Sequence, residues 1–426
     1  MGGTRLPSQL LPSCLPPPHP VYIRHLSLTN FRNYRRLEVS LPTGALILVG
    51  RNAQGKTSIL EAIHYLTSAS SLHGTDRQLL NWLAVRTDAN PFMKIVAEVV
   101  TAHEIRKVDV RLETSDGGFG KERPLRKTVL INGVRKQVGE LSRVVNAVLF
   151  LPQDMALVEG APALRRRYLD ALISQVDPDY APTLLEYGKV LTQRNALLKQ
   201  FGESGRSDES QLQFWDVQLC QHGAILINKR ARALEELELY ASRLHRDLTG
   251  GLDYLHLAYQ PNFDPVVQAS EQLQFGLTVP IQRARLAEAQ MMTSMQARLL
   301  ELRAEELARG VTVIGPHRDE LRFIASGVDI GLYGSRGQGR SAVLALKLAE
   351  LQWIHARTDE YPILLLDEVL AELDSQRRRD LLERTGVVQQ SLMTTTDLDG
   401  FEPAFRAQAR IWQIHQGTVE IPDHKR

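Results

Sequence analysis

The segment GRNAQGKT, residues 50–57, matches the phosphate-binding pattern GxxxxGK[ST] at every position. The apolar run Ala45–Val49 before it predicts a buried strand, and Ser58–Ile63 after it predicts the start of a helix. A glycine-rich turn between a strand and a helix points several backbone N–H groups into one concavity, where the helix dipole adds positive potential. A chance match in a glycine-containing turn is the alternative. We predict that the whole turn binds a nucleoside triphosphate through Gly50, Arg51, Asn52, Ala53, Gln54, Gly55, Lys56 and Thr57.

Two side chains of this turn carry more specific predictions. The Lys56 amine can reach the β- and γ-phosphates and act in catalysis, and the Thr57 hydroxyl can hold a Mg2+ ion. A second part of such a site follows the apolar run Ile363–Leu366, which predicts a buried parallel strand ending in Asp367 and Glu368. We predict that Asp367 holds the metal through water and that Glu368 polarises the attacking water. A strand that ends in two solvated acids is the alternative.

Bulk composition limits the class of protein. The 426 residues are enough for two or three domains, and 43% hydrophobic with 23% charged residues is ordinary for a globular chain. The net charge of +2 neither indicates nor excludes nucleic-acid binding, so any basic surface must be local. Two cysteines, Cys14 and Cys220, are too few for a disulfide framework and fit a reducing cytoplasm. No apolar run approaches the ~20 residues of a membrane span, so we expect a cytoplasmic protein without membrane association.

The chain divides by composition into four parts. Residues 1–20 are rich in Pro, Leu and Ser and predict a disordered extension; residues 21–162 form an N-terminal lobe with several strands. Residues 163–310 read mostly as helix, and residues 311–426 form a C-terminal lobe in which Val311–Ile314 and Glu320–Ile324 predict strands. We therefore predict an α/β core built from both chain ends, with antiparallel strands beside it and a helical insertion. The insertion should form a hairpin or small bundle, either as an ordinary subdomain or as a lever or docking arm.

Residues Gly334–Gln338 precede an amphipathic helix over Ser341–Glu350 and resemble the Ser-x-Gly-Gln signature of ABC-type ATPases. This signature commonly lies far from the phosphate loop of its own subunit and completes the site of a second copy. The resemblance implies an ATP-joined, head-to-tail homodimer, with Asp374 in the bridging D-loop; a polar turn that only caps a helix is the alternative. The nucleotide-binding residues would then also include Ser335, Gly337, Gln338 and Asp374.

Beyond these motifs, the chain resembles the bacterial RecF family of DNA replication and repair ATPases, which are related to the heads of SMC proteins. The match covers residues 21 to about 397. It is carried by Thr29–Tyr34, residues 50–57, Leu151–Asp154, Leu157–Gly160, Arg165–Asp170, Gln193–Leu198, Gly315–Asp319, Ala345–Glu350 and Pro362–Asp374. The resemblance implies a P-loop ABC/SMC-head-like ATPase that binds single-stranded and gapped DNA in an ATP-dependent way and hydrolyses ATP slowly. It also implies work with RecO and RecR to load RecA at junctions of single and double strands, and a role in the SOS response.

The chain departs from the family pattern at several positions. Glu368 replaces a second aspartate, and Arg336 and Gly339 depart from the usual signature. No His follows the next strand, where Thr395 or Thr396 could contact the γ-phosphate instead. Three further positions stay open. Gln153 lies near a Q-loop position and is a possible metal or water ligand, and His317 and Arg318 are either core residues or part of a nucleotide-responsive interface.

Several basic clusters could contact DNA phosphates, although a charge run is more often only a solvated face. They are Lys121–Lys127, Arg135-Lys136, Arg165–Arg167, and Lys229-Arg230 with Arg232. Aromatic residues total only 6%, which favours contact with a duplex backbone over base stacking.

The resulting hypothesis is an ATPase in which ATP joins two subunits around DNA and hydrolysis releases them. A nucleotide-gated DNA-binding scaffold with negligible turnover is the second hypothesis. A third, the motor subunit of a membrane transporter, is disfavoured by the missing His, the helical insertion and the Gly315–Asp319 motif.

Overall fold

The computed structural model describes residues 21–71, 74–102, 104–114, 125–204, 209–251, 253–263 and 287–421. The predicted extension at residues 1–20, with Cys14, lies outside the described residues, and so do Lys121 and Arg123 of the first basic cluster.

A six-stranded sheet forms the centre of the molecule, and strands from both ends of the chain build it. Its order is β15-β14-β3-β13-β12-β8. The five strands from β14 to β8 are parallel to one another, and β15 is antiparallel to β14. The strands are β3 (Gly44–Val49), β8 (Ala147–Phe150), β12 (Ile363–Asp367), β13 (Gln390–Thr395), β14 (Arg410–His415) and β15 (Thr418–Glu420). Because β3 and β12 both neighbour β13, the phosphate loop and the Asp367-Glu368 pair leave the same edge of the sheet. The predicted core from both chain ends is confirmed.

Strands β3, β8, β12 and β13 of this sheet are buried on both faces, which explains their nearly continuous apolar sequences, whereas β14 and β15 have exposed positions. Ile47, Leu364, Leu366 and Met393 belong to one core cluster, whereas Leu365 and its neighbours on alternate positions belong to the other. The second cluster includes α1 (Lys56–Ser68), which follows the phosphate loop. The first cluster lies toward α4 (Pro162–Val176) and α11 (Arg336–Thr358).

An antiparallel sheet packs beside this core, as the sequence predicts. Its order is β2-β1-β4-β5-β6-β7, with β1 (Tyr22–Phe31), β2 (Tyr34–Ser40), β4 (Phe92–Val100), β5 (Ile105–Thr114), β6 (Leu125–Ile131) and β7 (Val134–Lys136). Asn132 and Gly133 join β6 to β7 with φ of 52° and 79°, the left-handed turn that this residue pair favours. Gln390 ties the two sheets together, because its buried amide accepts from the Ile23 N–H (2.9 Å) and donates to the Ile23 and Pro42 carbonyls.

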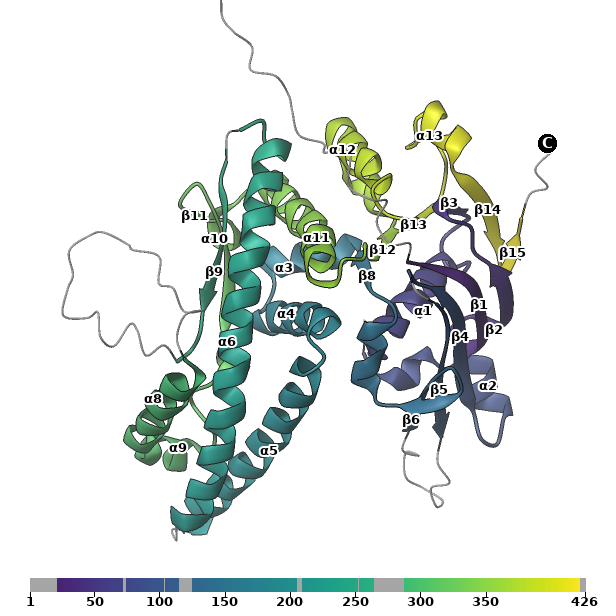
Figure 1. Cartoon of the computed structure of the whole chain (residues 1–426). Coiled ribbons are helices and arrows are strands. Elements are labelled where there is room, and N and C mark those ends of the chain that lie inside the picture. Colours follow the sequence, from purple (N-terminus) through teal and green to yellow (C-terminus); the bar gives the residue numbers. More distant parts are fainter. Residues whose placement is uncertain are drawn as a thin grey trace, which may run out of the picture.

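The helical segment forms an antiparallel hairpin at one side of the molecule (Figure 1). Helix α5 (Tyr180–Ser204) packs along α6 (Glu209–Leu248), and α6 also contacts α11 and α8 (Glu288–Glu301). At 40 residues, α6 is about 60 Å long. Helix α9 (Arg303–Arg309) ends at Gly310, whose φ of +64° is the left-handed stop expected of a glycine there. None of the helices among the described residues is long and apolar enough to cross a bilayer.

One expectation about this region is incomplete and another is wrong. The mostly helical stretch contains a strand, β9 (Leu255–Gln260), which pairs with β10 (Glu320–Ala325) and, through it, with β11 (Val328–Asp329). The predicted strand over Val311–Ile314 is irregular instead. Side chains take up the backbone groups that a neighbouring strand would need, since the Thr312 N–H donates to Asn195 and the Thr312 carbonyl accepts from Arg318.

The remaining elements are mostly short. They are α2 (Trp82–Thr87), α3 (Ala156–Glu159), α10 (Ile330–Tyr333), α12 (Ser375–Thr385), α13 (Pro403–Gln408) and the 3₁₀ turns η1 (Asp76–Leu79), η2 (Val138–Arg143), η3 (Pro152–Met155), η5 (Pro316–Arg318) and η6 (Val369–Glu372).

Candidate nucleotide-binding site

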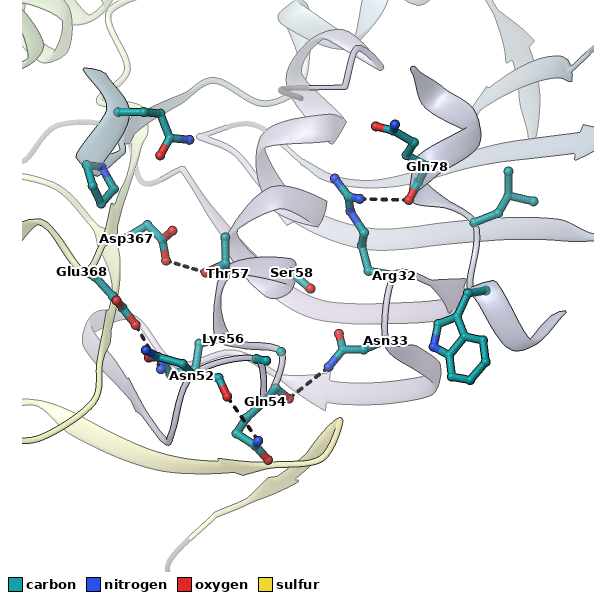
Figure 2. Close-up of a pocket in the computed structure, with 16 residues that line it drawn as sticks. Arg32, Asn33, Asn52, Gln54, Lys56, Thr57, Ser58, Gln78, Asp367 and Glu368 are labelled. Carbon is teal, nitrogen blue, oxygen red and sulfur yellow. Dashed lines mark hydrogen bonds and ion pairs between the residues drawn. The ribbon is translucent and has the colours of Figure 1, made fainter. Parts of the chain in front are cut away.

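A pocket of about 540 Å³ opens at the carboxyl edge of the central sheet. It collects residues that lie far apart in the sequence: the phosphate loop from Asn52 to Thr57, the β1–β2 turn, η1 with the start of α2, η3, and the two carboxylates after β12. Figure 2 shows Asp367 and Glu368 on one side of Lys56 and Thr57, with Arg32 and Gln78 on the other. The edge where parallel strands end is the usual ligand position in such sheets.

The backbone of the phosphate loop is held open by its neighbours. Gly55 has φ of 114°, and a Cβ there would lie 2.5 Å from Asn33 Nδ2 and 2.8 Å from the Tyr34 hydroxyl, so this position requires glycine. The Asn33 amide donates to the Gln54 carbonyl at 3.0 Å, and the Gln416 N–H donates to the Gln54 side chain at 2.7 Å. The loop is thus anchored by both sheets before any ligand enters.

Lys56 points across this loop toward the carboxylates. Its amine donates to the Gly50 carbonyl at 2.6 Å and the Arg51 carbonyl at 3.2 Å, and it lies 3.1 Å from Glu368 Oε1. Gly50 and Arg51 therefore support Lys56 through their carbonyls instead of lining the pocket themselves. The Lys56 side chain is only 3% exposed, whereas Glu368 is 37% exposed.

Asp367 forms the centre of a small hydroxyl cluster. Its Oδ1 accepts from the Thr57 hydroxyl at 2.8 Å and from the Thr394 hydroxyl at 2.7 Å. Burial raises the pKa of Asp367, and the bonds donated by Thr394 and Thr57 oppose that rise. Thr394 also accepts from the Glu368 N–H at 3.0 Å. One hydroxyl of β13 therefore contacts both Asp367, the last residue of β12, and Glu368, the residue after it.

Thr394 contacts the two predicted carboxylate residues, and the sequence analysis did not single it out. The two neighbouring candidates, Thr395 and Thr396, instead bond to Asp397 at the end of the strand. The register of β12 with β13 pairs Asp367 with Thr394, and alternation of side chains along the strand could have suggested it.

A second missed residue is Arg32, which lies in the β1–β2 turn with φ of 51°. Its guanidinium donates to both carboxylate oxygens of Glu61 on α1, at 2.7 and 2.6 Å, and to the Gln78 carbonyl at 2.9 Å. It joins the helix after the phosphate loop to the far end of the pocket. The run of family residues Thr29–Tyr34 was the available signal.

Gln153 lies in η3 and lines the pocket together with Asp367 and Glu368. Its place fits the predicted ligand role, which stays a prediction. The signature residues and Asp374 do not line this pocket. Ser335 caps α11 by accepting from the Gln338 N–H, and the Gln338 side chain accepts from the Ser335 N–H at 3.0 Å. The helix thus begins at Arg336, earlier than the predicted Ser341.

Asp374 caps α12 by accepting from the Arg377 N–H at 2.9 Å, and the bonds from Arg377 lower the pKa of this carboxyl. Arg377 also donates to the Ser341 hydroxyl on α11 at 2.7 Å. A hydrogen bond therefore connects the start of α12 with α11, and Ser335 and Gly337 are exposed.

The prediction that Arg165 and Arg230 contact DNA is wrong, because both side chains are buried in ion pairs. Arg165 donates to both oxygens of Glu320 at 2.7 and 2.8 Å. Arg230 is 2% exposed and pairs with Asp170 at 2.8 Å and Asp319 at 2.9 Å. Among the described members of the predicted clusters, exposed cations include Arg126, Arg135, Lys136 and Arg167.

His317 is a partly buried core residue. Its Nδ1 lies 2.6 Å from the Tyr187 hydroxyl, and Nε2 lies 3.4 Å from the Thr312 carbonyl. Burial lowers the pKa of His317 to about 4, so the ring is neutral at physiological pH. Arg318 donates to the same Thr312 carbonyl. Both residues fix the loop between α9 and β10.

The parallel core, the phosphate loop and the carboxylates at the end of β12 define a P-loop nucleotide-binding protein of the ABC and SMC-head class. Residues 22–420 match the family model described as the RecF/RecN/SMC N-terminal domain, and the relatives place the chain within this family among the RecF proteins, to which it belongs. It is 42% identical over 412 residues to the DNA replication and repair protein RecF of Roseiflexus castenholzii, covering 94% of this chain and 99% of that relative.

Other relatives agree. Identity is 41% over 410 residues with RecF of Chloroflexus aurantiacus and 35% over 402 residues with RecF of Bacillus cereus, with 94% of this chain covered in both. A solved structure of the recombination mediator protein RecF with ATP, from the RecFOR pathway, is similar with a TM-score of 0.79 at 28% identity. The similarity covers 95% of this chain and 98% of that one.

Proposed function

We propose that this chain is an ATP-dependent DNA-binding protein of DNA replication and recombinational repair, in which ATP joins two copies and slow hydrolysis releases them. The observation that carries the proposal is the convergence of the phosphate loop, Asp367 and Glu368 on one pocket, in a chain of the RecF family. The ATP-containing RecF structure supports ATP as the ligand. As for bacterial DNA repair proteins in general, the place of action would be the cytoplasm.

The pocket is suited to Mg2+. The Thr57 hydroxyl and the Asp367 carboxylate are 2.8 Å apart and are hard oxygen ligands, and Gln153 offers a third oxygen from η3. Within the described ranges no group of three or more His, Cys, Asp and Glu side chains could hold a metal. Phosphate oxygens and water would thus complete the shell, as is usual for Mg2+. The bound ion would neutralise phosphate charge.

The protein's own residues divide the work of hydrolysis. Lys56 would leave Glu368 to bind the β- and γ-phosphates, which frees the Glu368 carboxylate to accept a proton from the attacking water. Thr394 would keep Asp367 and Glu368 in position through its two hydrogen bonds. Because Glu368 starts in an ion pair with Lys56, each turnover needs that pair to exchange, which favours slow hydrolysis.

The signature turn would act on a second copy. Ser335 and Gly337 are exposed, lie outside the pocket of their own chain and sit at the N-terminus of a 23-residue helix, whose dipole favours an anion. Placed over the γ-phosphate of a partner protomer, Ser335, Gly337 and Gln338 would close the site, with Asp374 at the junction. Head-to-tail pairing then makes two equal sites in a two-fold dimer.

DNA contact would use exposed cations such as Arg126, Arg135, Lys136 and Arg167, which bind phosphates without reading sequence. We propose gapped and single-stranded DNA as the targets, with RecO and RecR as partners in supporting RecA loading. The RecFOR pathway named for the matched structure supports these partners.

The test is phosphate release by the full chain, with and without gapped, duplex and single-stranded DNA, together with DNA binding over a salt series. We expect weak, DNA-stimulated release that Lys56→Ala abolishes, and ATP-dependent binding that weakens as salt rises. A protein that binds DNA equally with and without ATP would contradict the proposal. Binding that responds to ATP without phosphate release would favour the second candidate, a nucleotide-gated scaffold, which the Lys56–Glu368 ion pair makes reasonable.

A further inference from the structure

Trp82 is an exposed aromatic residue at the wall of the nucleotide pocket. It lines the pocket together with Leu80 and Gln78, and 58% of its surface is exposed. The other three tryptophans are more buried, with Trp353 at 2% and Trp412 at 4%. A large aromatic surface exposed at the wall of a pocket is suited to contact with a flat ligand group.

The position of the phosphates determines which part of a nucleotide would reach Trp82. Lys56 and Thr57 fix the β- and γ-phosphate end, next to Asp367 and Glu368. In Figure 2, Ser58, Arg32 and Gln78 lie on the side away from those carboxylates. A nucleoside attached to the α-phosphate must therefore extend toward Arg32.

Hydrogen bonds made by the residues just before Trp82 place it at that same end. The Arg32 N–H donates to the Leu79 carbonyl at 2.7 Å. Asn81, which is 1% exposed, donates from its amide to the Arg32 carbonyl at 2.7 Å and from its N–H to the Asn30 carbonyl at 2.8 Å. The Asn81 side chain also caps α2 by accepting from the N–H groups of residues 83 and 84. Trp82, the next residue, therefore starts α2 directly beside Arg32.

A neighbouring cation completes this wall. The guanidinium carbon of Arg86, one turn along α2, lies 6.0 Å from the centre of the Trp82 ring. The cation partly fixes the indole, and the exposed remainder of the ring borders the pocket. A base that stacks there would join the indole and the guanidinium in one layered arrangement.

We propose that Trp82 is the stacking platform for the purine base of the bound triphosphate, with Asn81 as its positioning residue. This inference rests on the proposed nucleotide site and adds the base subsite to it. The phosphate loop contacts only the triphosphate. Trp82 would therefore give purine nucleotides a higher affinity than inorganic polyphosphate or the smaller pyrimidine nucleotides.

The test compares Mg-ATP, Mg-UTP and Mg-tripolyphosphate by titration calorimetry on the full chain. We expect Trp82→Ala to weaken ATP binding about tenfold or more, the usual effect of removing an aromatic base platform. Tripolyphosphate binding should stay unchanged, UTP should lose less than ATP, and Trp82→Phe should restore most of the ATP affinity. Phe214→Ala is the matched control, because Phe214 is 59% exposed and lies on α6 outside the pocket.

Two outcomes overturn the inference and are distinguishable. If Trp82→Ala leaves ATP affinity unchanged, or weakens ATP and tripolyphosphate equally, Trp82 is not a base platform and the nucleotide site itself stands. If Lys56→Ala changes neither ligand, the nucleotide site is elsewhere and both proposals fall. ATP-induced quenching of tryptophan fluorescence, lost in Trp82→Phe, gives a second readout that a purely structural role would not produce.

Discussion

Glu368→Gln should bind ATP more tightly than the unaltered chain and hydrolyse it far more slowly. In the structure Glu368 Oε1 lies 3.1 Å from the Lys56 amine, so ATP must displace this carboxylate to reach Lys56. Glutamine keeps the size and removes the charge. At this separation the attraction would be about 5 kcal/mol for an effective dielectric of 20. Glu368 is 37% exposed, so solvent screening reduces the net value to about 1 kcal/mol.

Removal of that competition, and of repulsion between the carboxylate and the γ-phosphate, should raise ATP affinity roughly five- to twentyfold. Loss of the group that accepts the proton from water should lower single-turnover hydrolysis by about 100-fold or more. Equilibrium ATP binding and phosphate release measure the two effects, with the exposed Glu383→Gln on α12 as the control. An unchanged hydrolysis rate together with unchanged ATP affinity would refute the roles assigned to both residues.

Three further outcomes follow from the buried polar groups. Thr394→Val should lower hydrolysis about tenfold or more and leave ATP binding nearly intact, because it removes the hydroxyl that bonds the Asp367 carboxylate and the Glu368 backbone N–H. Thr395→Val is the control, and an equal loss in both variants would contradict the role. Arg194→Met should lower the free energy of unfolding, measured in urea, by about 3–5 kcal/mol, because the fully buried Arg194 guanidinium pairs with two carboxylates. The control Lys199→Met, at an exposed position, should change this free energy little. Similar losses in the two variants would argue against the network. His317, with its pKa lowered to about 4, stays neutral in the folded protein, whereas in the unfolded chain it takes up a proton below about pH 6.5. The free energy of unfolding should therefore fall by about 2 kcal/mol between pH 8 and pH 5. His317→Gln should lose less over that range, and an identical pH dependence in both proteins would contradict this assignment.

The parts of the site that local pattern defines could be predicted from the sequence. The phosphate loop needs a strand, a glycine turn and a helix in direct succession, and the Asp367-Glu368 pair needs an apolar strand immediately before it. The hairpin at Asn132-Gly133 and the helix end at Gly310 also depend on local backbone preferences, and the structure has them where expected.

The rest depends on contacts between distant segments. Thr394 comes to Asp367 through the register of two strands. Trp82 comes to the wall of the pocket through two hydrogen bonds between its neighbours and Arg32 in the β1–β2 turn and one between Asn81 and Asn30 of β1. Arg165 and Arg230 look like surface cations in sequence, but Glu320, Asp170 and Asp319 come from elsewhere in the chain to pair with them. Charge alone does not say whether a partner will arrive, so sequence cannot separate such arginines from DNA-binding ones.

The most direct measurement is sedimentation velocity, with and without Mg-ATP, on Lys56→Ala, on Ser335→Arg, and on their equimolar mixture. If the triphosphate is shared between the phosphate loop of one protomer and the Ser335 turn of the other, both sites of either variant's homodimer are damaged. Each variant alone should then remain monomeric. Their mixture contains one intact site per pair, so we expect a dimer fraction with ATP that exceeds that of either variant. A mixture that stays as monomeric as its parts, while the unaltered chain dimerises with ATP, would contradict a shared site; an unaltered chain that sediments identically with and without ATP would contradict the ATP-joined dimer itself.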